Sequence, residues 1–213
     1  MEKLAKIRVS PGYLRRYHRA SAIGLAAFIA LHLLNHLALL IGPEAHIAVQ
    51  NVLRRFYRAP FIEPLLLGAC ALQVLTGLKL AWSRRWPPLF WHRLQLISGL
   101  LIAAFLAVHV SAALFTRATQ PDIDTTVYWA AAVVSRPAFA AFFAPYYLIG
   151  VAAVFAHLAA FMALKRRKSR MAQVIFASGV LVGGLIVAGL MGVFGAIDLP
   201  PAYQTYLDTY GAK

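Results

Sequence analysis

Five long apolar stretches constrain the fold of this chain more than any other feature. Each is long enough to cross a bilayer, which takes about 20 residues of helix. Backbone polar groups in lipid must be satisfied within the protein, so these stretches are predicted to be α-helices. The predicted spans cover roughly residues 20–41, 62–82, 94–115, 142–164 and 172–196. They use most of the sequence, so residues 1–213 are expected to form a single membrane domain.

Composition also favours an all-α integral membrane protein. Hydrophobic residues make up 61% of the chain and charged residues only 13%, whereas a soluble domain carries about a quarter charged residues. The first apolar stretch is longer than the core of a signal peptide, and no small-residue cleavage site follows it, so no cleavable signal is expected. The single cysteine, Cys70, lies inside a predicted span, which excludes a disulfide within the chain.

The distribution of Lys and Arg predicts the orientation, because cytoplasmic loops carry an excess of both. The N-terminus, the second loop (84–93) and the fourth loop (165–170) are strongly basic, while aspartates lie in the third loop and in the C-terminal tail. This pattern predicts an up-down bundle with its N-terminus in the cytoplasm and its C-terminus outside. The expected location is the inner (cytoplasmic) membrane of a cell, as a multi-pass protein.

The first loop departs from this charge pattern, because it places Arg54, Arg55 and Arg58 on the outer side. Residues 46–57 are predicted to form a short interfacial helix whose cations meet lipid headgroups or haem propionates. The net charge of +14 is therefore mainly a topology signal, since the cations flank the spans. The lipid bilayer is an expected partner, and nucleic acid is not.

Four histidines lie inside apolar segments: His32, His36, His109 and His157. A polar residue in a bilayer is costly and persists mostly where it faces the interior of a bundle. At about 1.5 Å per residue, His32 lies roughly 18 Å and His109 roughly 22 Å from the inner ends of their spans. His157 and Gln73 lie only roughly 10 and 13 Å from theirs. Depth therefore predicts an outer and an inner level of polar residues.

Imidazole is well suited to bind a buried iron, and a bis-histidine haem needs one imidazole from each of two helices at equal depth. His32 and His109 meet this requirement. His36 lies one turn beyond His32 on the same helix face and fits on depth as well. The alternative is that these histidines only bond across helices as packing contacts. Spacing alone does not separate the two interpretations.

Several segments resemble the five-helix cytochrome b membrane subunit of succinate dehydrogenases and fumarate reductases. The resemblance covers nearly the whole hydrophobic chain, and the order and depth of its pieces are more specific than any one of them. The segments are YHRAS (17–21) and FIALHLLN (28–35) at the first span, LQLISG (94–99) and FLAVHV (105–110) in the third, and YLIGV (147–151) and FAHL (155–158) in the fourth.

The resemblance implies a membrane anchor that passes electrons between an iron–sulfur subunit, b-type haem and quinone. In the family the outer haem is bound from spans one and three, which corresponds to His32 and His109 and leaves His36 as an alternate ligand or neighbour. The inner haem is bound from spans two and four, which corresponds to His157 and to Gln73 in place of a histidine. An amide is a poor ligand for haem iron, so one haem b is expected, with zero or two as alternatives.

Three outcomes are open for the inner level. Gln73 and His157 hydrogen-bond to one another in an empty site, His157 alone holds a five-coordinate haem, or the chain serves a different redox partner that needs one haem. The expected partners are quinone and, on the cytoplasmic face, flavoprotein and iron–sulfur subunits. The chain itself would be the subunit of a quinone-linked oxidoreductase that does not bind dicarboxylate. Rival functions are a haem-free structural anchor, a small transporter or a standalone cytochrome b.

The predictions for the remaining polar residues rest on weaker signals. Glu63, a carboxylate at the outer membrane boundary, is either a proton relay for quinone or a solvated residue at a helix N-terminus. His18 and His92 are expected at the inner interface as surface residues. His46, in the outer loop, is a minor candidate for contact with quinone or with a haem propionate.

Overall fold

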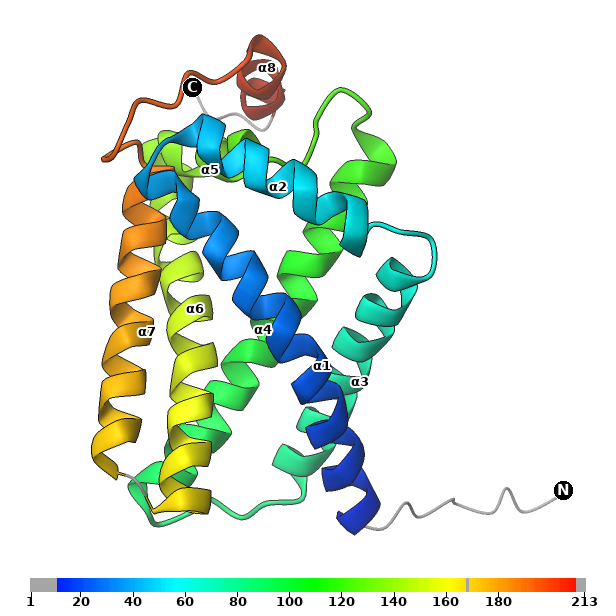
Figure 1. Cartoon of the computed structure of the whole chain (residues 1–213), viewed down its shortest axis with the longest axis vertical. Helices are drawn as coiled ribbons and strands as arrows, with labels where there is room; N and C mark the ends of the chain where they lie inside the picture. Colours follow the sequence, from blue (N-terminus) through cyan, green and yellow to red (C-terminus); the bar gives the residue numbers. More distant parts are fainter. Residues whose placement is uncertain (1–10, 168, 210–213) are drawn as a thin grey trace, which may run out of the picture.

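The computed structural model describes residues 11–167 and 169–209, and in this part of the chain every regular element is a helix (Figure 1). The basic N-terminal residues 1–10 and Lys168, which contribute to the predicted orientation, lie outside the described residues. The all-helical prediction is confirmed. The helices are α1 (Pro11–Leu37), the 3-10 helix η1 (Ala38–Leu40), α2 (Pro43–Tyr57), α3 (Ile62–Trp82), α4 (Phe90–Thr119), α5 (Val127–Ser135), α6 (Pro137–Arg166), α7 (Ser169–Leu190) and α8 (Pro201–Thr209).

Five helices are long and apolar enough to cross a membrane, as predicted. Several extend further into their polar flanks than expected, so that α6 begins at Pro137 rather than near residue 142. The last apolar helix ends earlier than predicted, at Leu190. The chain turns there at Gly192, whose φ of +78° favours glycine. The five spans are Gly12–Leu40, Ile62–Trp82, Phe90–Thr119, Pro137–Arg166 and Ser169–Leu190.

The five spans run between the two ends of the bundle (Figure 1). α7 packs along α6, α6 packs against α4, and α3 contacts both α1 and α4. Among the described residues, no Cα atom of α1 lies within 8 Å of a Cα atom of α4 or α6. In the described part of the chain α3 therefore bridges α1 to α4.

Small residues bring α6 and α7 close together. A Cβ atom on Gly179 of α7 would lie 2.2 Å from Cβ of Phe155 of α6, and one on Gly183 would lie 3.0 Å from Leu148. On the α6 side, Ala159 and Ala160 are fully buried. Helix association in lipid depends on such close packing, because lipid tails are as apolar as the helices themselves.

Three short helices, α2, α5 and α8, cover one end of the bundle (Figure 1). A helix over the predicted residues 46–57 is confirmed as α2, which begins slightly earlier and runs across this end, and its interfacial position stays a prediction. His46 and Gln50 of α2 are buried, whereas Val52 and Phe56 are exposed. Polar residues of α2 therefore face the protein, and its exposed side mixes these apolar side chains with Glu44, Asn51 and Arg55.

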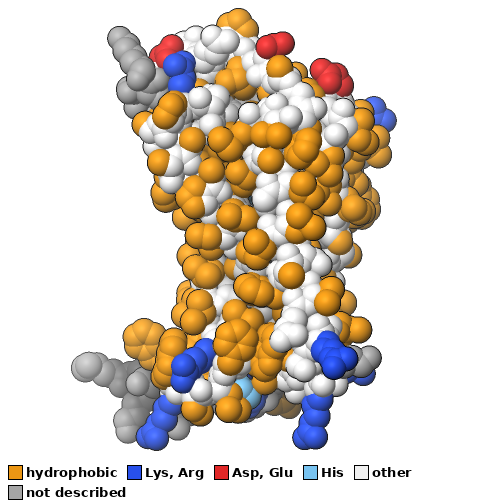
Figure 2. All heavy atoms as spheres, turned by 90° about the vertical axis from the view of Figure 1, so that its left-hand side faces the viewer, with side chains coloured by type: hydrophobic (Ala, Val, Ile, Leu, Met, Phe, Trp, Pro, Cys, Tyr) orange, Lys and Arg blue, Asp and Glu red, His pale blue; other side chains and the backbone are white. Residues whose placement is uncertain are grey.

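Apolar side chains cover the middle of the face shown in Figure 2, and charged side chains gather at the two ends of the molecule. Lys and Arg dominate one end, and Asp and Glu lie at the other. α6 and α7 contribute exposed apolar side chains such as Ile149, Leu158, Val174 and Leu181. This is the surface expected of helices in contact with acyl chains.

Gly179→Ala tests the packing of α6 against α7. The added methyl group meets Phe155, so we expect overpacking to lower stability by about 1–3 kcal/mol. Gly184→Ala in the same helix is the matched control, because a Cβ there has nothing within 4 Å. Thermal unfolding in detergent should show a lower midpoint for Gly179→Ala only. Equal midpoints for the two variants would contradict the observed helix contact.

Candidate functional site

His32 of α1 and His109 of α4 face one another across the gap between their helices. Their ring centroids are 6.1 Å apart and their planes are inclined at 68°. Phe28 stacks on His32 at 5.6 Å, and Phe105 stacks on His109 at 5.1 Å, one turn earlier on each helix. The structure therefore brings together the two residues that the sequence predicts as a pair, and an aromatic ring orients each imidazole.

Two further histidines extend this pair into a cluster. His36 Nε2 lies 3.3 Å from His32 Nε2, and His36 Nδ1 lies 3.4 Å from His46 Nε2. Asn35 Nδ2 donates to the same nitrogen of His46 at 3.2 Å. We call His32, His36, His46 and His109 the outer-level cluster, because it lies toward the end covered by α2, which the predicted orientation places outside.

His46 is a member of this cluster that the sequence prediction placed only in the outer loop. It is fully buried, with 0% of its surface exposed. Burial and the nearby cation of Arg54 lower the pKa of His46 to about 4, so the ring is neutral at pH 7. The sequence signal for the burial of His46 is a spacing of four residues, which places His46, Gln50, Arg54 and Arg58 in one stripe along α2.

The outer-level cluster has donors that suit haem iron. Imidazole nitrogens bind first-row metals at about 2.0 Å, so two rings on opposite sides of one iron stay several ångströms apart, as His32 and His109 do. The separated backbones of α1 and α4 agree with this arrangement. His36 must release Nε2 of His32 before that nitrogen can bind a metal.

Among the described residues, no group of three or more His, Cys, Asp or Glu side chains is arranged to hold a metal ion. This finding argues against a protein-only metal centre of the zinc type, which needs three or four such ligands. Haem iron takes only its axial ligands from the protein. A pair of histidines is therefore all that a haem site requires of the protein as iron ligands.

A small hollow of about 150 Å³ lies beside His32, between α1, α2 and α3. Its walls are mostly apolar, and the imidazole of His32 and the phenol ring of Tyr57 are its polar parts. Apolar walls with a few polar groups are typical of sites for small ligands. The hollow is lined by Gly24, Ala27, Phe28, Leu31, His32, Leu53, Phe56, Tyr57 and Leu66.

At the opposite, inner level, Gln73 and His157 do not meet. Gln73 Nε2 donates to the backbone carbonyl of His18 at 2.8 Å, and His157 Nδ1 lies 3.2 Å from Oγ of Ser98. Of the three outcomes left open for this level, the one with a hydrogen bond between Gln73 and His157 is therefore not the arrangement in the structure. The reason is that the N-terminal part of α1 packs against α3, so the amide bonds to α1 instead of α6.

His18 also differs from its prediction as a surface residue. It is half-buried, and its Nδ1 lies 2.8 Å from Oγ1 of Thr76 in α3. A Cβ atom on Gly77 would lie 3.4 Å from Cε1 of His18, so the ring rests against the backbone of α3. The first span was predicted to begin near residue 20, whereas α1 begins at Pro11 and therefore includes His18.

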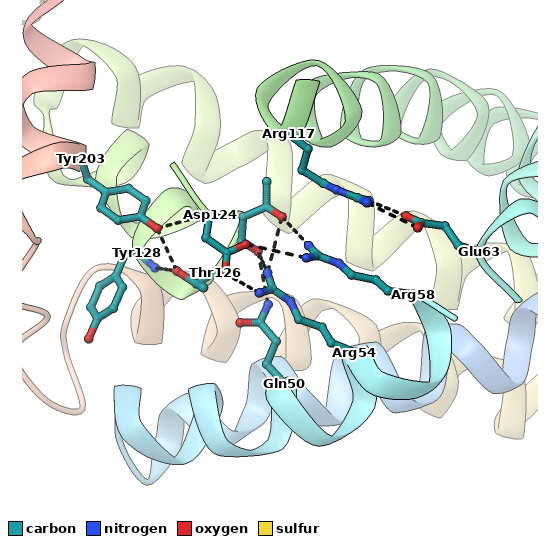
Figure 3. A network of polar contacts seen from close by, with 10 residues as sticks. Gln50, Arg54, Arg58, Glu63, Arg117, Asp124, Thr126, Tyr128 and Tyr203 are labelled. Atoms are coloured by element: carbon teal, nitrogen blue, oxygen red, sulfur yellow. Dashed lines mark hydrogen bonds and ion pairs between the residues drawn. The ribbon is translucent and has the colours of Figure 1, made fainter. Parts of the chain in front are cut away.

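Charged side chains connect the outer ends of the helices (Figure 3). Arg54 of α2 bonds to the Asp124 carboxylate at 2.5 Å and to the Thr125 carbonyl at 2.6 Å. Arg58 donates to Oγ1 of Thr125 at 2.9 Å. Tyr203 of α8 donates to the Asp124 carbonyl at 2.7 Å. The loop between α4 and α5 is thereby fixed to α2 and α8.

Glu63 lies at the start of α3, where Arg117 of α4 holds its carboxylate (Figure 3). The contact is two-pronged, since both guanidinium NH groups of Arg117 reach Glu63. The Glu63 side chain keeps 26% of its surface exposed. Its role as a proton relay stays a prediction, and Arg117 would have to loosen its hold before the carboxylate takes up a proton.

Comparisons with protein-family models, characterised proteins and solved structures return no match for this chain. The resemblance to cytochrome b subunits therefore stays a prediction that rests on sequence motifs.

Asp124→Asn tests whether Arg54 fixes the outer loop. Arg54 has only 11% of its side chain exposed, so it would keep a poorly solvated charge without its anion. We expect a loss of stability of about 1–3 kcal/mol and faster proteolysis within residues 120–126. Asp122→Asn, an exposed aspartate in the same loop, is the control. Equal cleavage rates in both variants would refute this role of Asp124.

Proposed function

We propose that this chain is a membrane anchor and electron-transfer subunit that holds a b-type haem between His32 and His109. It would exchange electrons with quinone for a complex of the succinate dehydrogenase or fumarate reductase kind. The observation that supports this proposal is the facing pair itself, two imidazoles 6.1 Å apart on helices whose backbones stay separated.

Haem bound at this site would supply a one-electron carrier inside the membrane. The chain's own contribution is to hold and orient the two rings. Phe28 and Phe105 fix the planes of His32 and His109 by stacking. Tyr146 of α6 stacks on Phe105 in turn and donates a hydrogen bond to the Phe105 carbonyl, which ties α6 to the same level.

The hollow beside His32 is the proposed site for the quinone ring. Its apolar walls suit a ring with a long apolar tail, and His32 and Tyr57 are the polar groups within reach of a carbonyl oxygen. Quinone reduction takes up protons, and Glu63 is retained as the proposed relay at the outer boundary.

The proposed topology is an up-down bundle in the cytoplasmic membrane, with the N-terminus inside and the C-terminus outside. Its support is the separation of charge, with cations at the end of α6 and in the loop before α4, and aspartates at the end covered by α2, α5 and α8 (Figure 2). Flavoprotein and iron–sulfur subunits would dock at the cationic end. The chain therefore contributes the membrane part of the reaction and no dicarboxylate site.

One observation favours the rival function, a haem-free structural anchor. In the structure His32 Nε2 is already 3.3 Å from His36 Nε2, so this nitrogen of His32 has a hydrogen-bond partner without iron. Histidines that serve as packing contacts would make this bond permanently. The two functions differ directly in haem content.

His109→Leu tests the proposed function. We expect this variant to lose the haem held between α1 and α4, because leucine cannot bind iron, and to lower the haem content by one per chain. His36→Leu should retain that haem if His32 is the ligand. The measurement is a pyridine haemochrome assay with the Soret band of the purified full chain.

His92→Leu is the matched control, because it makes the same change near the opposite end of α4. Its haem content should equal that of the wild type. A wild-type protein with no Soret band would refute the proposed function, and so would a His109→Leu variant with undiminished haem.

A further inference from the structure

A hollow of about 660 Å³ lies along the first turns of α1, at the end of the bundle opposite α2, α5 and α8 (Figure 1). It shares no residue with the outer-level cluster or with the hollow beside His32. Half of its lining residues are arginines, and the others are small or apolar. The lining residues are Gly12, Arg15, Arg16, Arg19, Ala20 and Ile23.

These residues form one face of α1, because they follow one another at spacings of three and four residues. All of them are exposed. The side of α1 that carries His18 is held by α3 instead, since Gln73 donates to the His18 carbonyl and the His18 ring rests against Gly77. We call the exposed side the arginine face, and it points away from the rest of the described bundle.

No carboxylate of the described chain neutralises the arginine face. The acidic residues that the structure describes lie in α2, at the start of α3, in the loop before α5 and in the tail after α7, at the opposite end of the bundle. Arg16 and Arg19 form no ion pair with any of them. By contrast, Arg93 at the same end donates to the Pro87 carbonyl at 2.8 Å. The arginine face is therefore available to an anion from outside the described chain.

The same side of α1 becomes apolar within two turns. Ile23, which is 70% exposed, follows Arg16 by seven residues, about 10 Å along the helix axis. Ala20, Ala27 and Leu31 continue this exposed apolar surface. Because α1 is long and apolar enough to cross a membrane, this surface suits contact with acyl chains. A ligand on the arginine face therefore meets guanidinium groups at one end and hydrocarbon at the other.

This combination of side chains favours a phospholipid over an acidic protein. Arginine binds phosphate through two parallel N–H···O bonds, and clusters of cations beside a membrane span attract anionic lipids. Tyr13 and Tyr17, both exposed, lie among the arginines, and tyrosine is enriched where a span meets the membrane surface. An acidic protein would match the cations but not the apolar surface that follows them.

We propose that the arginine face binds an anionic phospholipid. Its phosphate contacts Arg16 and Arg19, and one acyl chain lies along Ala20 and Ile23. Arg15 completes the cationic lining of the hollow. The bound lipid fixes the first turns of α1 to the membrane on the side that α3 does not cover. Haem has no part in this site, so the proposal is independent of the proposed function.

The test is native mass spectrometry of the purified full chain in detergent. Dioleoyl phosphatidylglycerol and dioleoyl phosphatidylcholine are added separately at equal concentration, because they share acyl chains and differ in net charge. We expect the wild type to bind its first phosphatidylglycerol about tenfold more tightly than phosphatidylcholine. Arg16→Gln/Arg19→Gln should lose this preference, and its unfolding midpoint in lipid-free detergent should equal that of the wild type.

Arg166→Gln/Arg170→Gln is the matched control, because it removes two exposed arginines from the same end of the bundle. This variant should keep the preference of the wild type. An equal loss in the two double variants would show that net charge alone attracts the lipid, and it would overturn the site. Equal affinities of the wild type for the two lipids would overturn it as well.

Two further measurements separate a lipid from a free anion. Excess inorganic phosphate should leave the bound phosphatidylglycerol in place, because phosphate lacks acyl chains. Ile23→Ser should weaken binding of phosphatidylglycerol, since it removes apolar contact below the arginines. Displacement of the lipid by phosphate, or unchanged affinity in Ile23→Ser, would contradict the assignment to a phospholipid. None of these results depends on haem content, so failure of the proposed function leaves them interpretable.

Discussion

The high cost of an unpaired polar group in hydrocarbon is the constraint on which this structure depends. It forces the spans to be helices, and it forces polar side chains to meet between them. Gln73 reaches back to α1, Ser98 receives His157, and His36 joins His32 to His46. Each of these contacts links two helices or orders two turns of one. The polar residues of the bundle are therefore gathered into two levels rather than scattered over its lipid-facing surface.

The two levels solve the same problem differently. At the outer level several imidazoles bond to one another and lie beneath α2, whose polar stripe is tied to the Asp124 loop. At the inner level each imidazole is held by a hydroxyl of a neighbouring helix and rests on a glycine. The outer level is not fully satisfied, because Asn35 Oδ1 and His46 Nδ1 are buried without a hydrogen-bond partner among the described residues.

Periodicity and depth predicted the five spans, the helix at α2 and the meeting of His32 with His109, because these follow from the length of apolar runs and the helical rise. The same reasoning missed His18, since it placed the start of the first helix near residue 20 and so left His18 outside. It also paired Gln73 with His157 on depth alone. Depth does not say which helices are neighbours, and α3 packs against α1 rather than α6. His46 was predicted only as a minor candidate for contact with quinone or a propionate, and its contact with His36 was not foreseen because the two residues lie on different helices.

The most direct test of this account is near-infrared magnetic circular dichroism of the oxidised full chain, which reports the axial ligands of each low-spin haem independently of any activity. The account predicts a low-spin haem with bis-imidazole ligation in the wild type and the loss of this signal in His109→Leu. A spectrum without haem signals, or one that His109→Leu leaves unaltered, would contradict it.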